Sequence, residues 1–209
     1  MGEAQWRANQ DKGAAGLASS FKVGAWNHFG SFDDQRFGAD GRSLADPLSN
    51  GVAQRRRGDH GVYGVIDQQI WRPASGEPDK GVGVFARAAG SPSDRNLIDL
   101  YFDGGIVFSG LVPKRPDDVV SFGAAFARIS DGARGLDQDA AVVAGKGLVR
   151  SSEVAFDANY QAQIVAGWQV DLDLQRIVRP SGGIANPADL TGAAIPSATV
   201  LTLHTSIKY

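Results

Sequence analysis

Strict alternation of polar and apolar residues is the feature that most constrains how this chain folds. Over residues 152–165 it separates two sets: Glu153, Asp157, Asn159, Gln161 and Gln163 against Val154, Phe156, Ala158, Tyr160 and Ile164. Successive side chains of a strand point to opposite faces, so the segment predicts a strand with one wet and one apolar face. After Ala166-Gly167 the pattern resumes, with Trp168, Val170, Leu172 and Leu174 against Gln169, Asp171, Asp173 and Gln175. Two such strands joined by a tight turn predict an antiparallel hairpin.

Seven other segments carry the same signal. Strands are predicted at 2–10, 20–29, 60–71, 81–89, 97–110, 119–130 and 198–209, which with the hairpin makes nine. Almost no window has the 3.6-residue period of an amphipathic helix, so the fold class is all-β. In segment 119–130, Val120, Phe122 and Phe126 share one face, while the other face carries only small residues. The alternation of polar and apolar residues does not account for that small-residue face.

The connections between these strands alternate in length. Long connections are predicted at 30–59, 131–151 and 180–197, and short ones at 73–80, 113–118 and 166–167, with 91–96 as an exception. Outer-membrane barrels have short periplasmic turns and long outer loops, whereas a soluble sandwich has no reason to sort connections by end. The pattern therefore favours an antiparallel transmembrane β-barrel.

Composition excludes several classes of protein. The net charge of −2 over 209 residues gives no electrostatic support for a nucleic-acid partner, and the absence of cysteine excludes disulfides and thiolate metal sites. No run approaches the roughly 20 apolar residues of a membrane helix. Mean hydropathy is −0.18, a value that fits a soluble protein and also a barrel, because half of each barrel strand faces water. The first residues lack the basic and apolar regions of a secretory signal peptide.

Several segments resemble the carbohydrate-selective porins of the OprB family. They are "YGVIDQQIWRP", "SPSDRNLIDLYFDGGIVFSGLVPKRPDD", "FARISD", "NYQAQIVAGW" and "TLHTSIKY", and the resemblance extends over essentially the whole chain. It implies a barrel of sixteen strands, of which residues 1–209 would supply about eight or nine as the C-terminal half. The constriction residues of such a porin would then lie in an absent N-terminal half. Tyr209 ends an alternating strand, like the assembly signal of outer-membrane proteins, and would place that end in the periplasm.

The resemblance also implies a function. The expected protein is a passive channel for small carbohydrates such as glucose, located in the bacterial outer membrane, without catalysis or a cofactor. Membrane lipid and lipopolysaccharide are its expected surroundings. Half a barrel would leave two unpaired edges, so the chain is expected to close on itself, to associate with a copy or a missing half, or to be a fragment.

The polar faces of the strands supply the candidate lumen-lining residues. Carboxylates, amides and a phenol can exchange hydrogen bonds with water for hydrogen bonds with sugar hydroxyls at little net cost. The alternative is that these residues only hydrate the channel surface and bind no sugar. The candidates are Asp67, Arg87, Asp99, Tyr101, Asp103, Glu153, Asp157, Asn159, Gln161, Asp171 and Asp173. Asp67 is expected to face inward with Tyr63, and Gln68 outward.

Rival functions have weaker support. A soluble β-sandwich that binds carbohydrate is the main alternative, and an outer-membrane enzyme or adhesin is a third. The histidines, His28, His60 and His204, are too scattered for a metal site, and His204 with Ser206 lacks the third partner of a hydrolase. The basic run 55–57 would either bind lipopolysaccharide phosphates or be a solvated part of a loop.

Overall fold

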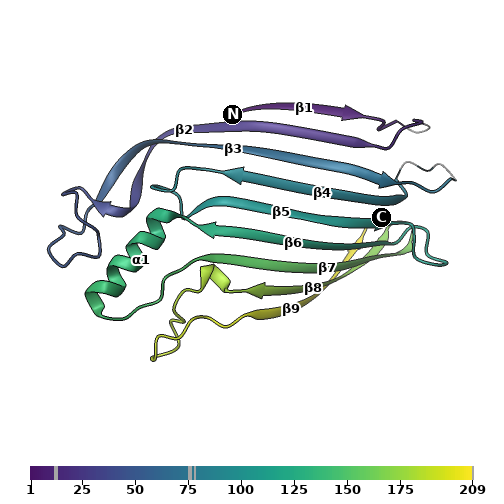
Figure 1. The fold of residues 1–209 in the computed structure, drawn as a ribbon. Coiled ribbons are helices and arrows are strands. Elements are labelled where there is room, and N and C mark those ends of the chain that lie inside the picture. Colours follow the sequence, from purple (N-terminus) through teal and green to yellow (C-terminus); the bar gives the residue numbers. More distant parts are fainter. Residues whose placement is uncertain (12–13, 75–76, 78, 209) are drawn as a thin grey trace.

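A computed structural model describes residues 1–11, 14–74, 77 and 79–208 of the chain. These residues form one antiparallel sheet of nine strands, and each strand pairs with its neighbours in the chain (Figure 1). The strands are β1 (Gly2–Ala8), β2 (Ser19–Gly38), β3 (Ala53–Trp71), β4 (Gly81–Gly90), β5 (Ile98–Ser109), β6 (Val119–Ile129), β7 (Ser152–Val165), β8 (Trp168–Val178) and β9 (Ala198–Ile207). The predicted all-β class and the nine strands are confirmed. In the part of the chain described, no second sheet packs on the first, so the fold is not a sandwich.

Connections are sorted by length between the two ends of the sheet. Segments 39–52, 91–97, 130–151 and 179–197 lie at one end, on the left of Figure 1, and 9–18, 72–80, 110–118 and 166–167 lie at the other. Apart from 91–97, the connections on the left are the longer ones. The predicted alternation of long and short connections is therefore confirmed.

The predicted loop at 30–59 is wrong. Most of it is strand, because β2 continues to Gly38 and β3 begins at Ala53. These extensions have polar residues on both faces, so they lack the alternation that marks a strand in sequence. Ion pairs join them instead: Arg55 pairs with Asp33, and Arg56 Nε donates to Asp34 Oδ2 at 2.8 Å.

A helix also occupies most of the predicted connection 131–151. Helix α1 (Asp131–Ala144) begins after Ser130, whose side chain accepts a hydrogen bond from the Ala133 N–H at 3.3 Å. It ends at Gly145, which has the left-handed conformation favoured at helix C-termini (φ 68°). Its apolar residues are mainly alanines, together with the exposed Val142 and Val143, and they form no wide buried stripe, which explains why periodicity does not predict the helix.

Helix α1 is tied to a strand far from its own. It follows β6, yet the guanidinium of Arg36 on β2 binds both carboxylate oxygens of Asp139, at 2.8 and 2.9 Å. A Cβ on Gly135 would lie within 2.6–2.9 Å of the Arg36 side chain, so glycine permits this close approach. The helix thus connects β6 with β2 across the ends of β3, β4 and β5 (Figure 1).

The sheet has almost no hydrophobic core of its own. Among the described residues, the buried hydrophobic side chains are Ile129 and Ala133. Large apolar side chains instead line one exposed face, called here the apolar face: Trp6, Phe21, Val62, Phe102, Phe122, Phe156, Leu174 and Leu203. Phe102 and Phe122 are each 51% exposed at directly neighbouring strands. Among the described residues, no helix is both long and apolar enough to cross a membrane.

A buried carboxylate fastens one of the short connections. The Asp118 side chain is 1% exposed and accepts hydrogen bonds from the Tyr160 hydroxyl, from Arg115 Nε at 2.8 Å and from the Gln163 N–H at 3.0 Å. Tyr160 and Gln163 belong to β7. Asp118 therefore anchors the end of segment 110–118 to the neighbouring strand.

Replacing Asp118 with alanine is expected to lower the free energy of unfolding by about 2–3 kcal/mol, because buried donors lose a charged acceptor. The matched control is Asp117→Ala, because Asp117 is 68% exposed and its carboxylate pairs with Lys80 at 3.0 Å. Denaturant titration in detergent compares the two. Equal losses would contradict the anchoring role of Asp118.

The tether of α1 is expected to depend on pH. The hydrogen bond from Arg36 holds the pKa of Asp139 below its usual value of 3.8. The tether is therefore intact above that value and is lost as the pH falls through the lowered pKa. Hydrogen-exchange protection of α1 should drop over this acidic range in the natural chain, and Asp139→Asn should remove the drop. The same acid-induced drop in Asp139→Asn would contradict this account.

Candidate functional site

The strand register defines a polar face opposite the apolar face. Residues that are directly paired in antiparallel strands share a face, so each register row can be followed across the sheet. One row contains Ser20, Asp67, Phe85, Gly105, Gly123, Asp157 and Gln175. The next row contains Lys22, Val65, Arg87, Asp103, Ala125 and Ala155.

Nearly all the predicted candidates belong to rows of this face. Beyond the two rows above, the register joins Tyr101 with Glu153 through Ala127, Asn159 with Asp173, and Gln161 with Asp171. Asp99 differs, because it lies at a bulge between Ile98 and Leu100. Gln68 follows Asp67 directly in β3 and therefore points to the opposite face of the sheet. Its amide donates to the Gln69 carbonyl at 2.6 Å.

Two of the predicted carboxylates are buried rather than open to water. Asp103 is 4% exposed, and its Oδ1 accepts from Arg87 Nε at 2.9 Å. Asp99 is 6% exposed and binds Arg128 through both oxygens, at 2.8 and 3.1 Å. Glu153 is also engaged, since it accepts from the Ser181 N–H at 2.6 Å. Asp99 and Asp103 therefore position arginines, whereas Asp67 and Arg87 are exposed.

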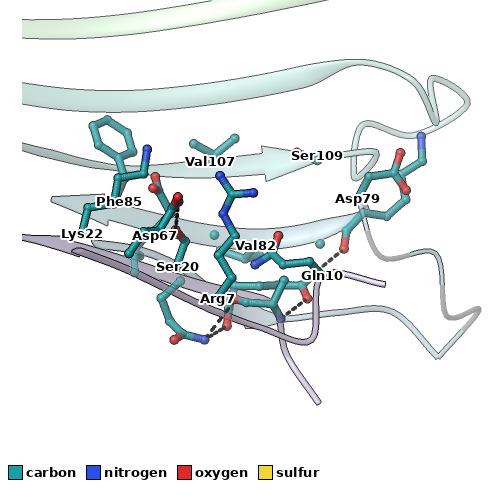
Figure 2. Close-up of a pocket in the computed structure, with 18 residues that line it drawn as sticks. Arg7, Gln10, Ser20, Lys22, Asp67, Asp79, Val82, Phe85, Val107 and Ser109 are labelled. Atoms are coloured by element: carbon teal, nitrogen blue, oxygen red, sulfur yellow. Dashed lines mark hydrogen bonds between the residues drawn. The ribbon is translucent and has the colours of Figure 1, made fainter. Parts of the chain in front are cut away.

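Several hollows lie on the polar face, and two of them share the Phe85 side chain. The larger has a volume of about 590 Å³ and is lined by charged groups of both signs, among them Arg7, Lys22, Asp67 and Asp79 (Figure 2). The smaller, of about 240 Å³, is lined by Phe85, Arg87, Asp103, Ser121, Gly123, Ala125, Ala155, Asp157 and Gln175, with Tyr101, Gly104, Phe122 and Ala124. Phe85 belongs to both, so its ring stands between a charged hollow and one with a floor of small residues.

Sequence reasoning missed several residues of these hollows. Phe85 is the most informative, because it stands two residues before Arg87 in the alternating segment 81–89 and therefore lies on the polar face. This position in the alternation would have identified it. Arg7, Lys22 and Gln175 also line the hollows, and nothing but their place in alternating strands distinguishes them in sequence.

The histidines and the basic run 55–57 have surroundings unlike those of a metal or catalytic centre. His28 Nδ1 accepts from the Gly30 N–H at 3.0 Å, and the ring packs edge-on against Phe32. His204 lies 3.5 Å from Asp171. Within the described ranges, no group of three or more His, Cys, Asp or Glu side chains could hold a metal. The basic run 55–57 lies on β3 rather than in a loop, and Arg55 and Arg56 are paired with aspartates.

Removing the Asp99 carboxylate is expected to destabilise the sheet. Asp99→Ala should lower the free energy of unfolding by about 2–3 kcal/mol, because Arg128 loses two charge-assisted hydrogen bonds. Asp171→Ala is the control and should cost less than about 1 kcal/mol, because its histidine partner is exposed. Chemical denaturation of both variants in detergent measures the difference. An Asp171 effect as large as the Asp99 effect would refute the distinction.

Comparison with known proteins agrees with this architecture. The family model "Carbohydrate-selective porin, OprB family" matches residues 1–209. Porin B of Pseudomonas aeruginosa is 26% identical over 119 residues, which is 57% of this chain and 26% of that protein. The solved high-pH structure of Pseudomonas putida OprB superimposes with a TM-score of 0.82 at 21% identity, covering 98% of this chain and 47% of that one. The chain thus spans less than half the length of these relatives. It belongs to the OprB family of carbohydrate-selective porins.

Proposed function

We propose that this chain forms part of the wall of a passive channel for small carbohydrates in the bacterial outer membrane. The observation that carries the proposal is the division of one sheet into two faces, with exposed aromatic and aliphatic side chains on one and charged side chains on the other. A sheet between lipid and a water-filled lumen needs this division. Family membership supports the transport function and sugar as the cargo.

The proposed channel is a closed barrel. In the part of the chain described, β1 pairs with β2 alone and β9 with β8 alone, so two strand edges remain. Each unpaired backbone group in hydrocarbon costs several kcal/mol, and closed barrels avoid that cost. We propose that residues 1–209 are the C-terminal part of a sixteen-stranded barrel. Further strands or another copy of the chain would complete the wall.

The polar face is the proposed lumen surface. Exposed carboxylates, amides and Arg87 offer donors and acceptors that a sugar can use in place of water, so binding is weak and passage is fast. No catalytic step or cofactor is part of the proposal. The end that carries α1 and the longer connections is the proposed extracellular end. There, Arg57 is exposed and is the residue of the basic run offered to lipopolysaccharide phosphates.

Conductance tests the proposal. The 209-residue chain, refolded into a planar bilayer, is expected to give discrete current steps that glucose partly blocks in a concentration-dependent way. Sucrose and a non-sugar osmolyte at equal viscosity serve as controls. Lipid dependence is measured in parallel by flotation with vesicles. A monodisperse monomer that stays in water without detergent or lipid would contradict the membrane assignment.

A further inference from the structure

Phe85 is an aromatic ring on a face that is otherwise mostly polar. It is directly paired with Asp67 and with Gly105, and Arg87 is the next residue of β4 on the same face. Val82, Val84 and Ala86 occupy the apolar face of the same strand, so apolar positions were available for a phenylalanine. The ring is half-buried, and in Figure 2 it projects from the same side of the sheet as Lys22 and Asp67.

A glycine lets the Phe85 ring lie close to the sheet. Gly105 and Gly123 are directly paired in β5 and β6, and a Cβ on Gly105 would lie 2.8 Å from two atoms of the ring. A Cβ on Gly123 would lie 3.9 Å from the ring, an ordinary van der Waals distance, so Gly105 is the glycine that the ring requires. Glycine weakens a strand interior, and such glycines mark sites where another group approaches the backbone closely. At Gly105 those groups are the Phe122 carbonyl oxygen, which would lie 2.4 Å from a Cβ, and the Phe85 ring, which lies across the strands.

Polar groups surround the hollow beside the ring. Arg87 Cζ lies 5.9 Å from the ring centroid, and Asp103 holds its Nε while the side chain remains 57% exposed. On the far side, Gln175 Nε2 donates to Asp157 Oδ2 at 3.2 Å. Arg87 therefore offers N–H donors from one side, and Asp157 and Gln175 offer acceptors from the other.

The buried carboxylate of Asp103 forms part of the wall of this hollow. It is 4% exposed, and its Oδ1 accepts from Arg87 Nε at 2.9 Å. The Tyr101 phenol, which also lines the hollow, is its polar neighbour. Asp103 therefore holds the Arg87 guanidinium at the edge of the hollow.

The size of the hollow limits what it can hold. Its volume of about 240 Å³ lies below the roughly 300–1,000 Å³ of sites for drug-sized ligands, so it suits one small ring. A pyranose has an apolar C–H face and a rim of hydroxyls that donate and accept. The Phe85 ring can stack on the C–H face. The guanidinium of Arg87, the amide of Gln175 and the carboxylate of Asp157 can form hydrogen bonds with the hydroxyls. Charges of both signs line the hollow, which favours a neutral sugar over a sugar acid.

We propose that Phe85, Arg87, Asp157 and Gln175 form a binding subsite for one neutral pyranose on the wall of the polar face, with the sugar stacked on the Phe85 ring. This inference rests on the proposed function, since it names how that channel holds its cargo. The open hollow keeps the affinity low, which a transport site requires, because the sugar must also leave. The small residues Gly123, Ala125 and Ala155 form the floor that makes room for the sugar.

Saturation-transfer NMR on the full chain, folded in detergent micelles, tests the subsite without requiring a pore. Glucose is the probe, and sorbitol is its open-chain control, because it has hydroxyls but no ring. The natural chain is expected to bind glucose in preference to sorbitol. Phe85→Leu should weaken glucose binding about fivefold, in line with the worth of an aromatic contact, and Phe85→Tyr should restore it.

Phe102→Leu is the matched control, because Phe102 is 51% exposed on the apolar face and is not among the residues that line the hollow. It should leave glucose binding unchanged. Equal glucose binding by Phe85→Leu and the natural chain would overturn the subsite, and so would the absence of any preference for glucose over sorbitol. The bilayer measurement separates the two proposals. Glucose-blocked pores with no effect of Phe85→Leu would refute the subsite and leave the channel standing, whereas Phe85-dependent binding without pores would support the subsite and mean that residues 1–209 alone do not close the channel.

Discussion

The apolar face of a nine-stranded sheet has to be removed from water, and within the described residues the chain provides almost nothing to cover it. A soluble protein would pack a second layer on Phe102, Phe122 and Phe156, and none of the described residues forms a second sheet or a long helix there. The hydrophobic effect, which usually gives a domain its core, is here directed outward. Most other features of the molecule follow from this arrangement, including the polarity of the opposite face and the sorting of connections between the two ends.

Without a core, the sheet depends on polar anchors and on its backbone ladder. The buried carboxylates are each held by an arginine or by several donors, as at Asp99, Asp103 and Asp118. At the end with the longer connections, Arg36 and Arg56 join α1 and the extensions of β2 and β3. These contacts fix the shape of the wall where apolar packing cannot. They also explain why some acidic residues of the polar face are structural and others are free to meet solute.

The sequence predicts the strands well where one face is apolar and the other polar, because a two-residue period has a single structural meaning. It fails where that contrast ends. The outer parts of β2 and β3, near Asp33 and Arg55, have polar residues on both faces and were predicted as loop. Helix α1 was missed for a related reason, since it is held by the Arg36–Asp139 pair rather than by an apolar stripe.

The candidate site was only partly predictable. The position of a residue in the two-residue alternation assigns it to a face, and it would have assigned Phe85 to the polar face beside Arg87. The alternation does not identify which side chains pair across strands, so it could not distinguish the buried Asp103 from the exposed Asp67. The small residues Ser121, Gly123 and Ala125 of β6, which the polar and apolar pattern does not explain, line the hollow beside the Phe85 ring.

Single-cysteine labelling along β7 tests the central claim of two faces most directly. The natural chain contains no cysteine, so each introduced thiol reports its own position. With the chain in lipid vesicles, a membrane-impermeant aqueous maleimide should label positions 155, 157, 159 and 161 rapidly and positions 154, 156 and 158 slowly. A lipid-soluble quencher should quench fluorophores attached at these positions in the opposite order, most strongly at 154, 156 and 158. Uniform labelling along the strand, or alternation of the reverse sign, would contradict a sheet that separates lipid from water.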